Sequence, residues 1–424
     1  MGKHSARGAR EDGGGGTRGG GAGVATASGL ITLSTSLVSR GEIEGAERAA
    51  TKAVRILDVP IVGGGVEAQT LLLTAVNLLG EICVGKGDIT AAVGWFEKAV
   101  ALDPDGEIPE IGGGGAEKFL WLAQLSEEGG RESVGWYEKG VEVLRRGIGG
   151  GGEMEMDDDG GSREAGGLQE KRKKLASALC GIIEVYMTDL SWEDDAEQVC
   201  ERCITEALIV APSVPEPLQT LASIRISQGR LDEARKALRD SMALWKNAFE
   251  DDDDEEDGQT SSPTPTAEES KGAIVPDFPT RISLARLLME VGLAEDAVEV
   301  VERLVGEDDH SVEAWYLGGW GLYLLGTTES EKGAPGVPNG HDRVEQEKQR
   351  KAQMSSREWL RQSLKLYDIL EYEDDRLKEH ASELIEELDK ILGEGEDGDK
   401  DDEGDEWESD GSNEADEDDD MKDV

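Results

Sequence analysis

The sequence has few of the residues that build covalent frameworks or metal sites. Its 424 residues include four cysteines and four histidines. So few cysteines, behind an N-terminus with no apolar leader segment, predict a reducing compartment and exclude a disulfide-built scaffold. No apolar run approaches the ~20 residues of a membrane-spanning helix, so we expect no membrane span. These features predict a protein of the nucleus and cytoplasm.

Basic residues are also scarce. Lysine and arginine number 44 against 93 acidic residues, which gives a formal net charge of -49. This balance argues against direct nucleic-acid binding, because a phosphate backbone is bound through lysine and arginine. It also argues against an anionic membrane surface. It favours a basic partner or a strongly solvated chain.

Catalytic groupings cannot be recognised in the sequence. The four histidines are scattered, and no glycine run leads into the GK[ST] of a phosphate-binding loop. Cys200 and Cys203 form a C-x2-C motif with Cys180 upstream, but a zinc site needs four ligands. Cysteines inside a helical pattern pack as small apolar residues, so we expect buried structural thiols. We predict no enzyme activity, no metal and no cofactor.

The clearest pattern is the stretch Val76 to Pro104, VNLLGEICVGKGDITAAVGWFEKAVALDP. Apolar and small residues recur at helical spacing on both sides of a Lys86-Gly87-Asp88 turn, and Pro104 follows the second helix. Gly80 and Ala92 permit close helix contact, while large side chains fill the remaining space. This is the tetratricopeptide pattern, a helix pair of about 34 residues.

The spacing of this stretch recurs along the chain. A small residue, a glycine seven residues later and an alanine five residues after that appear four times: Ser34-Gly41-Ala46, Gly80-Gly87-Ala92, Ala222-Gly229-Ala234 and Ala285-Gly292-Ala297. A generic helical bundle would not need a glycine at the same offset each time. We therefore predict an all-α fold, a right-handed α-solenoid of about seven tetratricopeptide-like helix pairs.

Compositional shifts define the other segments. We predict a disordered Gly-rich arm over 1–24, a superhelix over 25–392 whose first repeat begins at Leu30, and a disordered acidic tail over 393–424. Residues 394–424 carry 18 acidic and 2 basic residues. Disordered inserts are predicted near 147–167, 250–272 and 327–350, the second containing eight consecutive acidic residues.

The first helices of such repeats line the inner groove. Residues beside the packing positions are the candidates for partner binding: Asn77, Glu81, Glu184, Gln219, Met289, Glu290 and Glu313. Their acids and amides suit a basic, extended peptide. The clamp that holds the C-terminal carboxylate of heat-shock chaperones needs lysine and asparagine in the groove, and Glu81 stands where its asparagine would be. That module is disfavoured.

Two short segments have regulatory interpretations. Lys171 to Lys174 (KRKK) is either a nuclear import signal or the solvated first turn of a helix. The PTPT motif at 263–266 follows Ser261 and Ser262 beside acidic residues, so 261–266 is a candidate phosphorylation segment.

Several stretches resemble a known family. They are LCGIIEVYMTDLSWE (179–193), PEPLQTLASIRISQGRLDEAR (215–235), EAWYLGGW (313–320) and REWLRQSLKLYDILEYEDDRLKEHASELIEEL (357–388), followed by the acidic tail. With them the chain resembles the dedicated assembly chaperones of ribosomal protein L four, a tetratricopeptide family. The resemblance implies a non-catalytic binder that shields the long basic internal loop of newly made L four and escorts it into the nucleus.

The charge supports the same reading on physical grounds. A ribosomal protein without its RNA exposes a dense positive surface, and acidic residues can replace the missing phosphates. We expect the groove to bind tightly and the tail to act as a diffuse polyanion. We also expect a monomer, with nuclear import factors as further candidate partners. The alternatives are an acidic histone-type chaperone and a general tetratricopeptide interaction scaffold.

Overall fold

The computed structural model describes residues 18–58, 65–149, 161–246, 275–327 and 340–393. Over these residues the regular structure is α-helical apart from one short 3-10 helix. The chain divides into two compact units, Met1–Val300 and Val301–Val424, and each is described separately.

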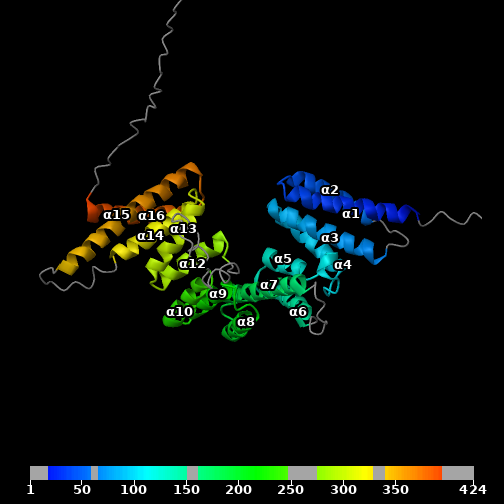
Figure 1. Cartoon of the computed structure of the whole chain (residues 1–424), viewed down its shortest axis with the longest axis horizontal. Coiled ribbons are helices and arrows are strands. Elements are labelled where there is room, and N and C mark those ends of the chain that lie inside the picture. The colour runs from blue at the N-terminus through cyan, green and yellow to red at the C-terminus, as the bar shows by residue number, and fades with distance from the viewer. Residues whose placement is uncertain (1–17, 59–64, 150–160, 247–274, 328–339, 394–424) are drawn as a thin grey trace, which may run out of the picture. The chain divides into compact units, whose positions relative to one another are not determined.

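Unit 1 is built from consecutive helix pairs. In chain order its helices are α1 (Arg18–Val38), α2 (Ile43–Leu57), α3 (Val66–Gly85), α4 (Ile89–Leu102), α5 (Glu117–Leu125), α6 (Gly130–Gly149), α7 (Gly161–Met187), α8 (Ala196–Val210), α9 (Glu216–Ser227), α10 (Leu231–Ala243) and α12 (Phe278–Glu290). The 3-10 helix η1 (Glu110–Gly112) lies between α4 and α5. Successive helices pack side by side, as α1 with α2 and α3 with α4 (Figure 1).

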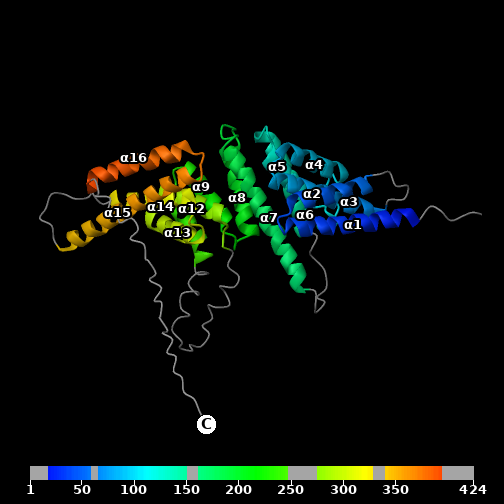
Figure 2. The same cartoon turned by 90° about the horizontal axis from the view of Figure 1, so that it is seen from above.

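Unit 2 begins inside α13 (Ala294–Glu307) and continues through α14 (Val312–Thr327), α15 (Gly340–Ile369) and α16 (Asp375–Leu392). Helix α15 packs along both α14 and α16, and the two views show these three helices together (Figures 1 and 2). Pairing α12 with α13 and α14 with α15 gives seven helix pairs and a last helix among the described residues. The predicted all-α solenoid of about seven pairs is therefore confirmed.

The repeated glycines end the first helices. Gly41, Gly87, Gly229 and Gly292 have φ between 72° and 76°, the left-handed region that favours glycine. In the second repeat the Gly87 N–H donates to the Val84 carbonyl at 2.9 Å, and the Asp88 N–H donates to the Cys83 carbonyl at 2.9 Å. The other three turns repeat this pair of bonds, a Schellman cap. The recurring offset is thus a requirement of the backbone at each turn.

Small residues let the paired helices approach closely. Ala92 and Phe96 of α4 are fully buried against α3. A Cβ atom added to Gly80 would lie 2.6 Å from the Phe96 ring, so only glycine fits this crossing. The same close approach recurs at Gly181 of α7, where an added Cβ atom would lie 2.5 Å from the phenol ring of Tyr137 on α6. Glycine at these positions fixes the helix spacing that shapes the site described below.

A buried ion pair fixes the connection between α4 and α5. Lys118 is 1% exposed, and its Nζ donates to Asp103 Oδ2 and to the Gly115 carbonyl, both at 2.9 Å. Burial lowers the pKa of Lys118, and the hydrogen bond to Asp103 opposes that change. The sequence gives no sign of this role, because a lysine is ordinarily exposed.

Several predicted boundaries are wrong because packing extends the helices. Helix α1 begins at Arg18, within the predicted arm, and Val24 and Ala27 pack into the core around α2. Helices α6 and α7 extend into the predicted insert at 147–167 from both sides, up to Gly149 and from Gly161. Helix α15 begins at Gly340 rather than after 350; most of its described side chains before Lys351 are exposed, and the helix contacts α14 further along, where Gln353 Nε2 donates to the Gly326 carbonyl at 3.0 Å. The insert at 250–272 and the tail from Glu394 lie outside the described residues.

Helix α3 corrects the expectation that no apolar run approaches membrane-spanning length. It has 20 residues, and its most apolar window has a mean hydropathy of 1.4. However, 56% of that window is buried inside the protein, against α1, α2 and α4. Core positions such as Leu73, Val76 and Leu79 account for its apolar composition.

Candidate functional site

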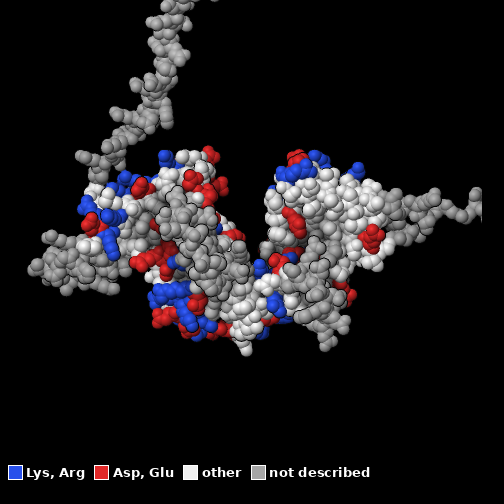
Figure 3. All heavy atoms as spheres, viewed as in Figure 1, with Lys and Arg blue, Asp and Glu red and all other residues white. Residues whose placement is uncertain are grey.

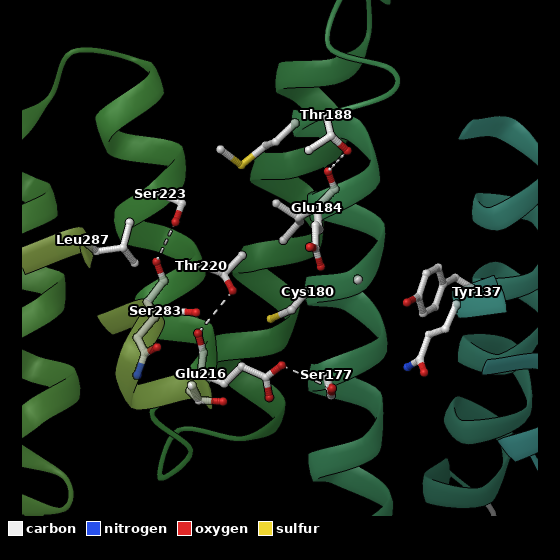
Figure 4. A pocket seen from close by; sticks show the side chains of 16 residues that line it. Tyr137, Ser177, Cys180, Glu184, Thr188, Glu216, Thr220, Ser223, Ser283 and Leu287 are labelled. Carbon is white, nitrogen blue, oxygen red and sulfur yellow. Dashed lines mark hydrogen bonds between the residues drawn. The ribbon is translucent and has the colours of Figure 1, made fainter. Parts of the chain in front are cut away.

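A pocket of about 530 Å³ opens along the first helices of unit 1. Its walls come from α5, α7, α9 and α12, with Tyr137 contributed by α6 (Figure 4). We call it the acidic pocket. Its polar lining residues are Gln124, Tyr137, Ser177, Cys180, Glu184, Thr188, Glu216, Gln219, Thr220, Ser223, Thr280 and Ser283.

Helical spacing brings these side chains to one face. On α7, Ser177 and Glu184 are seven residues apart and therefore two turns apart on the same stripe. On α9, Glu216, Thr220 and Ser223 follow at i, i+4 and i+7. Figure 4 shows the α7 and α9 side chains facing one another across the pocket, with Tyr137 approaching from the other side of α7.

The charge of the pocket is negative and is not neutralised within its lining. Among the described residues that line it, Glu184 and Glu216 are the only charged ones. Burial raises the pKa of Glu216, a hydrogen bond of 3.3 Å from Ser177 Oγ lowers it, and the charges of Asp277 and Glu184 raise it further. Burial and then Glu184 raise the pKa of Tyr137. The pocket thus holds carboxylates that a bound cation would stabilise.

Three hydroxyl groups that line the pocket donate to carbonyl groups of their own helices. Thr220 Oγ1 donates to the Glu216 carbonyl at 3.2 Å, Ser223 Oγ to the Gln219 carbonyl at 3.3 Å and Thr188 Oγ1 to the Glu184 carbonyl at 2.8 Å. Each hydroxyl hydrogen is directed to its own helix, so the oxygen lone pairs remain for a ligand. Together with the two carboxylates, they make a lining suited to a ligand rich in N–H donors.

A smaller hollow of about 270 Å³ adjoins the acidic pocket and shares Gln124, Tyr137 and Ser177 with it. In this hollow the Lys174 side chain supplies a positive charge. Its Nζ lies 2.5 Å from Glu117 Oε1 and 3.4 Å from Glu110 Oε1. Burial and the charge of Glu117 raise the pKa of Glu81, and Lys174 opposes that rise. Glu81 is thus placed near this second hollow.

The structure separates the candidate groove residues of unit 1. Glu184 lines the acidic pocket. Gln219 lies at the base of the same pocket, is 5% exposed, and its Nε2 donates to Ser241 Oγ at 3.4 Å. Met289 is 6% exposed, so its placement in the groove is wrong: it packs in the core. Glu290 is exposed but does not line the pocket.

Two further candidates lie outside the acidic pocket. Asn77 is half-buried on α3, and its Nδ2 donates to the Gly113 carbonyl at 2.6 Å, so it holds the loop before α5. Glu313 is half-buried in the first turn of α14 and belongs to unit 2.

Sequence reasoning missed Glu216, Ser177, Gln124 and Tyr137. Glu216 opens α9 directly after Pro215 and shares the stripe of Thr220, a signal visible in the sequence. In the sequence, Tyr137 stands in GWYEKG (135–140), which resembles GWFEKA (94–99), and there it takes the position of the core residue Phe96. Its place in the pocket lining, although the side chain is largely buried, follows from the crossing of α6 and α7, which no local pattern reveals.

All four cysteines are buried and unpaired, as expected of structural thiols. Burial raises the pKa of Cys180 to about 12 and that of Cys200 to about 11. Cys180 lines the acidic pocket, but a thiol with this pKa stays protonated near neutral pH and is a poor nucleophile.

The basic cluster Lys171 to Lys174 lies in the interior of α7, which begins at Gly161, so its interpretation as a first turn is wrong. The helical turns before Lys171 belong to the segment from Gly161 onward, part of which was predicted to be an insert (147–167). Lys174 is tied to Glu117 and Glu110, whereas Arg172 is exposed.

These features define a tetratricopeptide-repeat protein with an acidic pocket along its first helices. Models of the tetratricopeptide repeat match residues 73–105 and 218–255. The chain is 45% identical over 367 residues to a probable assembly chaperone of rpl4 from Emericella nidulans, covering 86% of this chain and 82% of the relative. It is 32% identical over 315 residues to a probable assembly chaperone of rpl4 from Schizosaccharomyces pombe, covering 74% and 80%.

A solved structure supports the same assignment. The assembly chaperone of RpL4 (Acl4, residues 1–338) is 46% identical, with a TM-score of 0.57, covering 72% of this chain and 98% of that chain. The chain belongs to the family of assembly chaperones of rpl4.

Proposed function

We propose that the chain is an assembly chaperone that binds rpl4 and holds a basic, extended segment of it, its internal loop, in the acidic pocket. The observation that carries this proposal is the lining itself, in which Glu184 and Glu216 face a ligand space without a basic side chain among the described lining residues. Relatives named assembly chaperones of rpl4 supply the identity of the partner.

The chemistry of the pocket fits arginine and lysine. A guanidinium group presents five N–H donors and no acceptor, which complements carboxylates and hydroxyl lone pairs. Binding a cation next to Glu216 relieves the unfavourable burial that raises its pKa. The free energy gained there offsets part of the cost of ordering an extended segment.

The proposed activity is non-catalytic. The partly shielded carboxylates bind and cover the basic segment, which keeps it from stray nucleic acid until it is transferred to the assembling ribosome. Binding of this kind depends on salt, because the partner exchanges small anions for the carboxylates of the pocket.

We extend the proposal to an escort that acts in the cytoplasm and the nucleus as a monomer. The test replaces Lys171, Arg172 and Lys173 with alanine in a fluorescently tagged chain. Loss of nuclear signal supports an import role for the cluster, and an unchanged distribution assigns import to the partner or to import factors that bind elsewhere.

The identity of the partner is tested first by affinity purification of the tagged chain followed by mass spectrometry. One ribosomal protein, rpl4, is expected at stoichiometric amounts. Recovery of histones in its place would establish the histone-type alternative and overturn the proposal.

The site is tested with purified proteins by comparing the double variant Glu184→Gln and Glu216→Gln with the matched control Glu97→Gln and Glu142→Gln. The control glutamates are exposed on the second helices α4 and α6, away from the pocket. Calorimetry with rpl4 should show weaker binding for the pocket variant only. Equal loss in both variants would mean that net charge, not the pocket, holds the partner.

A further inference from the structure

Unit 2 carries a hollow of the opposite charge to the acidic pocket. It has a volume of about 830 Å³ and is lined by α15 and by Trp315 of α14. Four cations line it: Lys351, Arg357, Arg361 and Lys365. We call it the basic groove. In a chain of net charge -49, four cations gathered at one hollow are unusual and require an explanation.

The basic groove follows a helical stripe. Positions 351, 354, 358, 361 and 365 are spaced i, i+3, i+7, i+10 and i+14 along α15, so they share one face. Lys351, Met354, Arg361 and Lys365 are exposed there, as is the single carboxylate of the lining, Glu358. The stripe from Lys351 to Lys365 is about 21 Å long at 1.5 Å per residue.

Two tryptophans give the groove an apolar wall. The rings of Trp315 and Trp359 meet edge to face, with centroids 4.8 Å apart. Trp315 Nε1 donates to the Asp309 carbonyl at 2.8 Å, which fixes the orientation of this indole. The groove therefore combines fixed aromatic surface with exposed cations, a surface that suits an extended acidic peptide.

The groove adjoins the point where the acidic tail leaves the fold. Arg357 Nη1 lies 3.0 Å from Asp389 Oδ1 of α16 and donates to the Gly393 carbonyl at 3.4 Å. Gly393 is the C-cap of α16, and the next residue begins the acidic tail. One groove residue thus contacts the backbone from which the tail continues.

We propose that the acidic tail, residues 394–424, docks in the basic groove of its own chain. The charges are complementary, because the tail carries 18 acidic and 2 basic residues. The tail is also long enough, since residues 394–424 span about 100 Å when extended, against about 21 Å for the stripe. Its origin beside Arg357 gives it a high effective concentration at the groove.

Docking makes the tail a switchable element. A docked tail is partly neutralised, and a tail released from the groove is a free polyanion. This consequence rests on the proposed function: a basic partner would compete with the groove for the tail. The docking itself is independent of that function and can be tested without any partner.

The direct test is zero-length crosslinking of the full-length chain with a carbodiimide, which joins a lysine amine to a carboxylate within contact distance. Peptide mapping should find Lys351 and Lys365 joined to tail carboxylates, several-fold more often than the exposed Lys52 and Lys236 of unit 1. A mixture of nitrogen-15-labelled and unlabelled chains identifies crosslinks between chains. Crosslinking of the tail to all exposed lysines at equal frequency, or crosslinks found only between chains, would overturn the proposal.

A second test uses charge reversal in the full-length chain. With Lys351→Glu and Lys365→Glu, we expect a non-specific protease to remove the tail roughly five-fold faster or more at low salt, because two contacts become repulsions. Lys52→Glu and Lys236→Glu alter the net charge equally and should leave the rate unchanged. Equal acceleration in both variants would show that the tail responds to net charge alone. Calorimetry with rpl4 is run separately, so failure of one proposal leaves the other standing.

Discussion

The acidic pocket and the basic groove have lining residues of opposite charge, although both are formed by the same kind of helix pair. In the pocket, Glu184 and Glu216 stand without a lining cation, and burial raises the pKa of Glu216. In the groove, Arg357 and Arg361 share Asp389 at 3.0 and 3.5 Å, while Lys351 and Lys365 stay exposed. The difference teaches that local neutralisation, not total charge, decides what a surface can bind.

The surface view agrees with this local control of charge. Figure 3 shows acidic and basic side chains interspersed over the visible face of each unit, although the whole chain carries -49. Much of the excess lies in acidic segments such as 394–424, so the folded surface retains room for both signs.

The largest expected effect is reversal of charge in the acidic pocket. Glu184→Lys with Glu216→Lys should weaken binding of rpl4 by about 100-fold or more, because two attractions become repulsions in a partly buried site. Titration calorimetry measures the affinity, and Glu97→Lys with Glu142→Lys is the control. A loss below ten-fold, or an equal loss in the control, would move the site away from this pocket.

The next largest effect is a loss of stability in unit 2, from a substitution that disrupts the close contact of α14 with α15 behind the basic groove. A Cβ atom at Gly319 would lie 2.7 Å from Leu360 Cγ and 3.1 Å from the Leu360 backbone nitrogen. Gly319→Val should therefore lower the free energy of unfolding by about 1–3 kcal/mol or more, since the backbone cannot yield. Thermal unfolding followed by circular dichroism measures this.

The matched control is Gly306→Ala on α13, where a Cβ atom meets no neighbour within 4 Å. It should raise stability by up to about 1 kcal/mol through helix propensity. If Gly319→Val proved neutral, the close contact of α14 with α15 would not be the feature that shapes the groove.

A third, smaller effect is the pH dependence of the pocket. Because the pKa of Glu216 is raised, its charge is lost over an interval of falling pH that lies above the usual glutamate range near about 4.3. Partner binding should weaken over this interval, and Glu216→Gln should flatten the dependence. A groove readout such as tail proteolysis should change little there, because lysine and arginine stay charged.

The sign for stability is opposite. The folded state holds the Glu216 proton more tightly than the unfolded state, so lowering the pH through the raised pKa stabilises the fold with respect to this group. Glu216→Gln should thus be neutral or slightly stabilising while it weakens binding. A destabilised variant would indicate that Glu216 has a structural role.

The smallest expected effect comes from Ser177. Its Oγ donates to Glu216 at 3.3 Å and lowers the pKa of that carboxyl. Ser177→Ala should move the pH profile of binding slightly upward, because it removes the one hydrogen bond that lowers the pKa of Glu216, and a single hydrogen bond contributes only about 1 kcal/mol. Ser227→Ala on α9, whose hydroxyl bonds the Ile224 carbonyl outside the pocket, should leave the profile unmoved.

The repeat was readable in the sequence because its physical cause is local. Each first helix ends at a residue with left-handed backbone conformation, so glycine recurs at Gly41, Gly87, Gly229 and Gly292. Small residues recur where paired helices cross. The boundaries were less readable. Helix α1 starts at Arg18 in spite of its glycines, because contact with α2 outweighs their low helix propensity.

The lining of the acidic pocket was predicted only in part. Glu184, a groove candidate from the sequence, does line the pocket, since its position on the α7 stripe is a local property; its role in partner binding stays a prediction. Met289 was assigned to the groove although it is buried. Adjacent residues of a helix point in different directions, so a shift of one position moves a side chain from the groove to the core. Glu216 could have been found from its stripe with Thr220, whereas the place of Tyr137 in the lining depends on the packing of α6 against α7.

The amino-acid sequence by itself determined the all-α repeat, its turn geometry and its acidic tail, because these depend on spacing within about 34 residues or on composition. Only the tertiary structure decided which pocket carboxylates have no cation beside them in the described lining, and where cations gather. Lys174 of α7 pairs with Glu117 of α5, whereas Glu216 of α9 lies near the like charges of Asp277 and Glu184, which raise its pKa. Such pairings join residues far apart in the chain, so they follow from packing and not from any local pattern.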